Sequence, residues 1–131
     1  MVTDVTRKLR LGPGQRLLVI EAPPTIEALL GPLPAGASFS SSDPSPDVTL
    51  LFATDLASLE HHLPPAARVA ADDRMLWVAY PKRGGGLISD LDRDGLTAAT
   101  ERLAALTGVT LISLDATCSA MRLRPSARYG R

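Results

Sequence analysis

The stretch RLLVIEAPP, from Arg16 to Pro24, decides how the fold begins. The residues up to Ala22 form a nearly continuous apolar run, which is typical of a strand buried on both faces of a parallel sheet. The two prolines then end the strand, because they have no amide to donate to a neighbouring strand. A short helix should follow, since Thr25 can cap its first turn and Gly31 can stop it.

Further apolar runs follow, at intervals that leave room for helices between them. We expect strands at Val48–Ala53, Arg74–Tyr80, Val109–Leu114 and Ser119–Arg124, and a weak edge strand at Ala37–Ser41. The last two strands are separated only by Asp115–Cys118, so they should form an antiparallel hairpin.

Two amphipathic helices should lie between these strands. The first is expected to begin at Asp55, its N-cap, and to break at Pro64–Pro65, with a further turn through Val69. The second carries an apolar stripe that ends at Leu106, and Gly108 should close it. Strand–helix alternation followed by a hairpin predicts an α/β fold, a mainly parallel, Rossmann-like, three-layer sheet with a C-terminal antiparallel hairpin.

Composition limits the classes of protein that the chain can belong to. At 131 residues it should form one domain, residues 1–131, with a basic flexible tail at about 125–131. The net charge of zero argues against strong nucleic-acid binding, although the arginines at both ends leave weak nucleic-acid contact as an alternative. The first residues do not resemble a signal peptide, and no apolar run approaches the length of a membrane span. We therefore expect a cytoplasmic chain without membrane contact.

Polar residues follow the predicted strands at the edge where parallel strands end. Ligands of open α/β sheets bind beyond these carboxyl ends. The candidate ligand-binding edge consists of Glu21, Lys82, Arg83, Gly84, Gly85, Gly86, Asp90, Asp115 and Ser119. One hypothesis is that Lys82, Arg83 and the Gly84–Gly86 amides hold an anionic group. The alternative is a flexible glycine loop whose aspartates, Asp92 or Asp94 above all, cap the next helix.

The sequence offers no set of residues that would carry out catalysis or hold a metal. His61 and His62 are adjacent, so on a helix they point about 100° apart and cannot chelate one ion together. Cys118 has Asp115 and Ser119 nearby in sequence but no evident histidine base, so it is interpreted as a small space-filling residue. We expect no catalytic residue, no metal and no cofactor.

Four pieces of the chain, in order, resemble an uncharacterised family of short bacterial domains. They are KLRLGPGQRLLVIEAPPTIEALLGPLP (8–34), VTLLFA (48–53), RMLWVAYPK…SDLDRD (74–94) and ISLDATCSAMRLRP (112–125), with Cys118 where the family more often has tryptophan. That family is similar in outline to a trimmed class I S-adenosylmethionine methyltransferase. The resemblance implies that PGQRLLVIEA is the first strand of such a core, RMLWVAYPK the fifth, and the final hairpin strands six and seven.

The turn after the first strand departs from the methyltransferase pattern. Those enzymes have a glycine-rich turn there, which lets the backbone approach the cofactor, whereas this chain has Glu21, Ala22, Pro23 and Pro24. The segment from Pro23 to Asp47 is also shorter than one strand–helix–strand unit of about 30 residues. The leading expectation is therefore a non-catalytic binding or interaction protein. The alternative is a small transferase-type enzyme with a reduced cofactor pocket, using Glu21, Lys82, Asp90 and Asp115.

Overall fold

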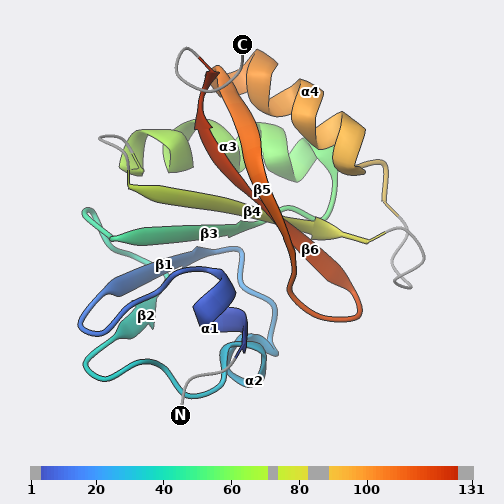
Figure 1. The fold of residues 1–131 in the computed structure, drawn as a ribbon. Helices are drawn as coiled ribbons and strands as arrows, with labels where there is room; N and C mark the ends of the chain where they lie inside the picture. Colours follow the sequence, from blue (N-terminus) through green and yellow to red (C-terminus); the bar gives the residue numbers. More distant parts are fainter. Residues whose placement is uncertain (1–3, 71–73, 83–88, 127–131) are drawn as a thin grey trace.

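A six-stranded mixed sheet runs through the molecule in the order β2-β1-β3-β4-β6-β5 (Figure 1). The computed structural model describes residues 4–70, 74–82 and 89–126. The strands are β1 (Arg16–Ile20), β2 (Ser38–Ser40), β3 (Val48–Phe52), β4 (Met75–Pro81), β5 (Leu106–Ser113) and β6 (Cys118–Pro125). The helices are α1 (Asp4–Lys8), α2 (Ile26–Leu30), α3 (Leu56–Val69) and α4 (Arg93–Ala104). Within the described ranges, no helix is long and apolar enough to cross a membrane.

The strand directions follow from the chain's hydrophobic pattern. β1 pairs in parallel with β2 and β3, and β3 in parallel with β4. All residues of β3 are buried, as expected for a central parallel strand covered on both faces. β6 runs antiparallel to both β4 and β5, so β5 points in the same direction as β4. The predicted antiparallel hairpin and the weak edge strand, now β2, are both confirmed.

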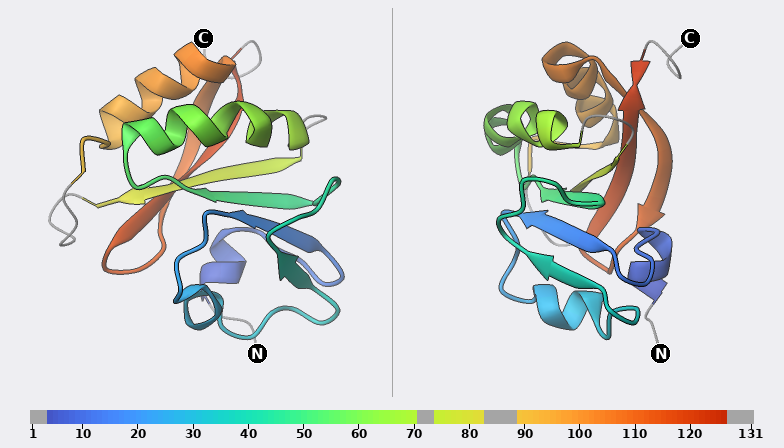
Figure 2. Two further views of the ribbon diagram at one scale, coloured as in Figure 1. Left: turned by 180° about the vertical axis from the view of Figure 1, so that it is seen from behind. Right: turned by 90° about the vertical axis from the view of Figure 1, so that its left-hand side faces the viewer.

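Helices cover the sheet on both faces, and the core has a separate part under each pair (Figure 2). Alternate residues of β4 divide between the two parts, because successive side chains of a strand point to opposite faces. Trp77 and Ala79 face α1 and α2, whereas Leu76 and Val78 face α3 and α4. The chain therefore forms three layers, two helical and one of strands.

Helix α1 was not expected from the sequence. Its residues are too few for a periodic pattern, yet Val5 and Leu9 at its end are buried in the core. Trp77 is fully buried beside this segment, and its Nε1 donates a hydrogen bond to the Leu9 carbonyl at 3.1 Å. The indole therefore has the polar partner that a buried tryptophan needs, and it fastens the amino-terminal segment to the sheet.

The predicted break at Pro64–Pro65 is wrong, because α3 runs through both prolines as one helix. Leu59 and Leu63 precede the break, Ala66 follows it, and all three are buried on the same face. Prolines in a helix interior lose amide donors and crowd the preceding turn. Here the buried residues before and after the prolines continue along one face of the helix, so packing on the sheet maintains the helix.

The predicted end of the last helix at Gly108 is also wrong. α4 ends earlier, at Ala104, and is capped by Ala105, which adopts the left-handed conformation with φ 53° and donates its amide to the Glu101 carbonyl at 3.0 Å. Leu106 already pairs with Pro125 of β6, so the strand starts directly after the cap. Gly108 lies within β5 against Met121, where a β-carbon would overlap the methionine side chain. The Met121 side chain therefore occupies the space over this glycine.

The carboxyl terminus is ordered further than expected. Pro125 belongs to β6, and Ser126 is buried, with its hydroxyl bonded to the Glu101 carboxylate and its amide to the Ala105 carbonyl at 2.9 Å. Pro125 and Ser126 thus belong to the packed structure, and the flexible tail expected at about 125–131 stays a prediction. Its remainder, residues 127–131, lies outside the described ranges, as does the turn expected at Asp72–Asp73.

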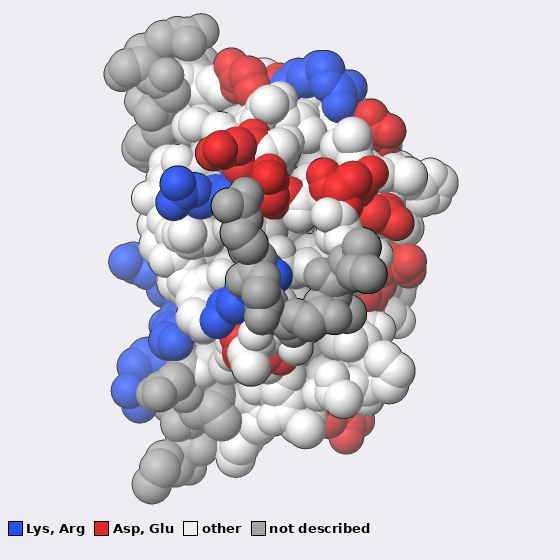
Figure 3. Space-filling model, turned by 90° about the vertical axis from the view of Figure 1, so that its right-hand side faces the viewer, with Lys and Arg blue, Asp and Glu red and all other residues white. Residues whose placement is uncertain are grey.

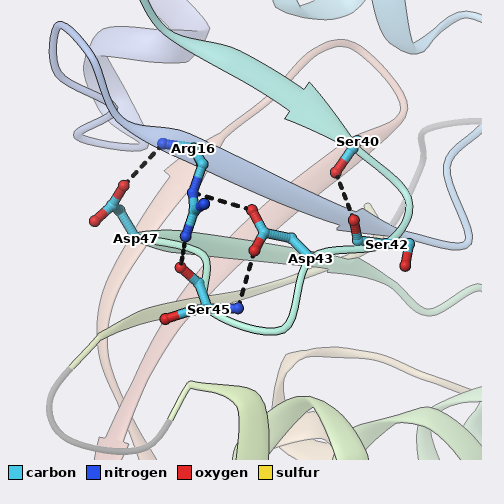
Figure 4. Close-up of polar contacts among 6 residues, drawn as sticks. All are labelled: Arg16, Ser40, Ser42, Asp43, Ser45 and Asp47. Atoms are coloured by element: carbon cyan, nitrogen blue, oxygen red, sulfur yellow. Dashed lines mark hydrogen bonds and ion pairs between the residues drawn. The ribbon is translucent and has the colours of Figure 1, made fainter.

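The loop between β2 and β3 is held at the amino end of β1 (Figure 4). The Arg16 guanidinium donates to the Ser45 carbonyl and lies 3.2 Å from the Asp43 carboxylate. The Arg16 amide donates to Asp47 at 2.9 Å, and Asp43 also accepts from the Ser45 amide at 2.9 Å. The loop itself includes a hydrogen bond from the Ser40 hydroxyl to the Ser42 carbonyl at 3.1 Å. These contacts are structural, and they lie at the sheet edge opposite the predicted site.

Candidate functional site

The carboxyl ends of β1, β3, β4 and β5 meet at one edge of the sheet, as the sequence predicts. Figure 3 shows this side of the molecule, with acidic side chains gathered in its upper part and basic ones mostly toward its left margin. Glu21 follows β1, Lys82 follows β4, Asp115 lies just beyond β5, and Ser119 is near the start of β6. The edge divides into a part closed by protein groups and a part that is open.

The end of β3 is closed by a segment that crosses it. The Ser89 hydroxyl donates to the Thr54 carbonyl at 2.6 Å, and Asp90 Oδ1 accepts from the Leu56 amide at 2.9 Å. Asp55 Oδ1 accepts from the Ser58 amide at 2.8 Å and so caps α3 as predicted. Asp90, proposed as a ligand-binding residue, thus bonds a free amide in the first turn of α3.

Glu21 also lies toward α3. Its carboxylate is 3.5 Å from Nε2 of His62 and is more than half exposed. Its backbone has φ 57°, a left-handed conformation that glycine adopts without strain. In the turn that follows, the Pro23 carbonyl accepts from the Ile26 amide at 3.0 Å to start α2. The turn after β1 is therefore engaged in local structure.

The other part, called the open part below, is the end of β4, which borders a hollow of about 390 Å³ among the described residues. Its lining residues come from the end of β4, the start of β6 and the start of α4, and they are Tyr80, Pro81, Lys82, Asp92, Arg93, Asp94 and Ser119. Tyr80, Ser119 and Ser113 are paired across three neighbouring strands, so their side chains project from the same face of the sheet. The register thus places a row of hydroxyl groups beside the hollow.

Lys82 places a charged group in contact with this row. Its ammonium donates to the Ser113 hydroxyl at 2.5 Å, and its amide donates to the Thr117 carbonyl at 2.7 Å. From the other side Lys8 donates to the Ser113 carbonyl at 3.1 Å. The chain has two lysines, and both reach the same residue. Lys82 retains further donors, since an ammonium has three.

Tyr80 gives the hollow a polar group that the fold itself does not use. The residue is 5% exposed, and its hydroxyl makes no hydrogen bond to any residue in the described ranges. Burial raises the pKa of Tyr80; the Arg93 guanidinium opposes this rise and the Asp92 carboxylate adds to it. The phenol therefore stays protonated over the physiological range and can donate a hydrogen bond to a ligand.

The start of α4 forms the acidic wall of the hollow. Asp92 Oδ1 accepts from the Gly95 amide at 2.8 Å, so the interpretation of Asp92 as a helix cap is confirmed. Arg93 and Asp94 are exposed in the first turn. Asp94 lies where the helix dipole stabilises a negative charge.

Asp115 and Cys118 form the turn of the hairpin. Asp115 Oδ1 accepts from the amides of Thr117 and Cys118, both at 2.8 Å. Burial raises the pKa of the Cys118 thiol, as does the nearby Asp115 carboxylate, whereas Lys82 acts to lower it. The thiol therefore remains protonated and is a poor nucleophile at neutral pH.

The structure brings together only part of the predicted site. Lys82 and Ser119 line the hollow, and Asp115 is in the adjacent turn. Glu21 and Asp90 belong to the closed part. Arg83 and the glycines Gly84, Gly85 and Gly86 lie outside the described residues, so the proposed anion-binding loop stays a prediction.

Sequence reasoning missed Tyr80, Pro81 and Arg93 as lining residues. Tyr80 looked like the last residue of a buried strand, and only the strand register reveals its position beside Ser119. In the described parts of the chain, no group of three or more histidine, cysteine or acidic residues could hold a metal ion. No family model, curated protein or solved structure matches the chain.

Proposed function

We propose that this chain is a non-catalytic binding protein that takes a small polar ligand in the hollow at the end of β4. The observation that carries the proposal is Tyr80, a largely buried residue that lines the hollow and whose hydroxyl makes no hydrogen bond to another described residue. A volume of about 390 Å³ falls within the usual range of small-molecule sites. The location agrees with the rule that open α/β sheets bind ligands beyond the carboxyl ends of their strands.

The scaffold that we propose is a reduced, methyltransferase-like form of the Rossmann-like fold. Its support is the strand order, in which β6 inserts antiparallel between β4 and β5 at the end of a parallel sheet. This is the arrangement expected if the final hairpin corresponds to strands six and seven of a methyltransferase core.

The closed part of the edge argues against S-adenosylmethionine as the ligand. An adenosyl cofactor in such a fold approaches the backbone after the first strand, where this chain has Pro23 and Pro24. The neighbouring end of β3 is occupied by Ser89 and Asp90, which bond to Thr54 and Leu56. A cofactor would have to displace contacts that hold α3 in place.

The charges around the hollow favour a ligand with an anionic group. Lys82 and Arg93 supply positive charge beside the Tyr80 and Ser119 hydroxyls. Of the two aspartates in the lining, Asp92 is engaged as the cap of α4. A carboxylate or phosphate placed between Lys82 and Tyr80 would receive charge-assisted hydrogen bonds, which are stronger than neutral ones.

Ligand titration with a matched pair of lysine variants tests the proposal. Nucleotides and phosphorylated or carboxylated metabolites would be screened by the amide shifts of Tyr80, Lys82 and residues 92–94. We expect Lys82→Met to weaken binding at least about tenfold, the equivalent of about 1.4 kcal/mol. Lys8→Met should leave it within about twofold, because that side chain also bonds Ser113 but lies outside the lining. No shift at millimolar ligand, or equal effects of both variants, would refute the proposal.

S-adenosylmethionine is the discriminating probe for the transferase alternative. The proposal predicts no binding at micromolar concentration by calorimetry. Micromolar binding accompanied by shifts at Glu21 and its neighbours would instead establish a cofactor pocket in the closed part of the edge.

A further inference from the structure

The residues that line the hollow carry charges of both signs, and these charges balance. Lys82 and Arg93 are positive, whereas Asp92 and Asp94 are negative. Figure 3 likewise shows acidic and basic side chains together on this side of the molecule. An anionic group on the ligand matches the positive charges of the lining but not the negative ones.

Both aspartates lie at the start of α4, but they differ in what they bond. Asp92 is the N-cap, and its Oδ1 accepts from the Gly95 amide. Asp94 is exposed in the first turn, and its carboxylate makes no hydrogen bond or ion pair with a residue that the structure describes. Asp94 therefore has acceptors to offer a ligand.

The neighbours of Asp94 in α4 do not neutralise it. Arg93 is adjacent, and adjacent side chains of a helix do not face each other. The position one turn later, where a basic residue would pair with the acid, is Ala98. Thr97, three residues on, donates its hydroxyl to the Arg93 carbonyl at 2.9 Å. The helix thus leaves the negative charge at the border of the hollow.

A ligand that is only anionic would bring its charge close to these carboxylates. Like charges repel, so the repulsion would offset part of the attraction to Lys82. A ligand that also carries an ammonium group avoids this, because the ammonium can donate charge-assisted hydrogen bonds to a carboxylate. A volume of about 390 Å³ leaves room for both groups and a short chain between them.

We propose that the ligand of the hollow is dipolar, with an anionic group between Lys82 and Tyr80 and an ammonium group bound by Asp94. This inference rests on the proposed function, and it narrows the ligand class to small molecules that have an amino group and a carboxylate or phosphate. Asp94 is exposed, so water screens the added ion pair. We therefore expect the ammonium group to strengthen binding about three- to fivefold.

Matched pairs of ligands test the ammonium group. β-Alanine would be compared with propionate, and phosphoethanolamine with ethyl phosphate, by the amide shifts of Tyr80, Lys82 and residues 92–94. The ligand with the amine should bind about three- to fivefold tighter than its partner in at least one pair. The pair that shows the difference identifies the anionic group as a carboxylate or a phosphate. Equal affinities within both pairs would overturn the inference.

Asp94→Asn tests which residue binds the ammonium group. The substitution should remove the difference within the pair, and it should not weaken binding of the amine-free ligand, because it removes a repulsive charge. Glu27→Gln is the matched control, since it removes an equal charge from the first turn of α2, outside the lining, and should preserve the difference. A difference that survives Asp94→Asn, or that Glu27→Gln reduces equally, would overturn the inference.

The same titrations separate this inference from the proposed function. If Lys82→Met weakens the binding of all four ligands while the members of each pair bind equally, the hollow binds anions and the dipolar class is wrong. If none of the four shifts these amides at millimolar concentration but a nucleotide does, the inference again fails and the proposed function stands. If no anionic ligand shifts them, both fail.

Discussion

The two parts of the carboxyl edge use the same kinds of side chain for different purposes. At the end of β3, Asp55, Ser89 and Asp90 bond backbone groups and close the edge over α3. At the end of β4, the Tyr80 hydroxyl makes no hydrogen bond to another described residue. The Lys82 ammonium has three donors and gives one of them to Ser113. Polar residues after a strand therefore do not by themselves mark a binding site. What distinguishes the two parts is whether the backbone already uses the polar groups.

The largest expected difference between the parts is in stability. The double variant Asp55→Ala/Asp90→Ala should lower the free energy of unfolding by about 2 kcal/mol, because each aspartate satisfies a free amide at the start of α3 and a lost cap costs about 1 kcal/mol. The matched double variant in the open part, Lys82→Met/Ser119→Ala, should change it by less than about 0.5 kcal/mol. Urea denaturation measures the free energy of unfolding of both double variants. Similar losses in the two would contradict the distinction between the closed and the open part.

Asp92 lines the hollow and its carboxylate also bonds a backbone amide, so its substitution should have an intermediate effect. Asp92→Ala should cost about 1 kcal/mol through the lost bond to the Gly95 amide, whereas Asp92→Asn keeps an acceptor and should cost a few tenths. Thermal unfolding of the two variants gives the comparison. If Asp92→Asn is as unstable as Asp92→Ala, the charge rather than the cap is what stabilises α4.

Tyr80→Phe isolates a hydroxyl that the fold does not use. Its free energy of unfolding at neutral pH should stay within about 0.5 kcal/mol of wild type, while ligand affinity falls. The raised pKa of Tyr80 means that the unfolded chain loses this proton first as the pH increases. Wild type should therefore lose stability above about pH 10 and the variant should lose less. Denaturation at several alkaline pH values checks this, and identical profiles would contradict it.

The smallest expected effect is on the reactivity of Cys118. Asp115→Asn removes a charge that raises the thiol pKa but keeps the acceptor for the turn, so alkylation at neutral pH should become faster. Lys82→Met removes a charge that lowers this pKa, so alkylation should become slower. The alkylation rates of both variants are measured with a neutral reagent. A change of the opposite sign in either variant would refute the inference that these two charges set the pKa of the Cys118 thiol.

Apolar runs and helix caps could be predicted from the sequence because they depend on neighbours along the chain. The run from Arg16, the run from Val48 and the cap at Asp55 all lie where expected. The errors arise where contacts distant in sequence decide the structure. Gly108 looked like a helix stop, but it lies within β5 under the Met121 side chain. The prolines of α3 are tolerated because the stripe on either side of them is buried.

From the sequence, the candidate site could be assigned to the carboxyl edge of the sheet, but not to the particular residues that line the hollow. Parallel strands bring their ends together, so the positions of Lys82 and Ser119 followed from topology. The strand pairing with Ser119 shows that Tyr80 lies beside the hollow. The hydrogen bond from the Leu56 amide shows that Asp90 belongs to the closed part of the edge. Both depend on register and loop path, which a pattern of residue types does not contain.

The convergence of both lysines on Ser113 has a consequence for covalent labelling of this protein. In most proteins, reagents that acylate side-chain amines scatter over the whole surface, but here the side-chain amines are those of two lysines, and such reagents do not modify arginine. Labels on the lysine side chains would therefore gather around Ser113. A short bifunctional ester would join α1 to the end of β4, tying the first helix to the strand whose end borders the pocket.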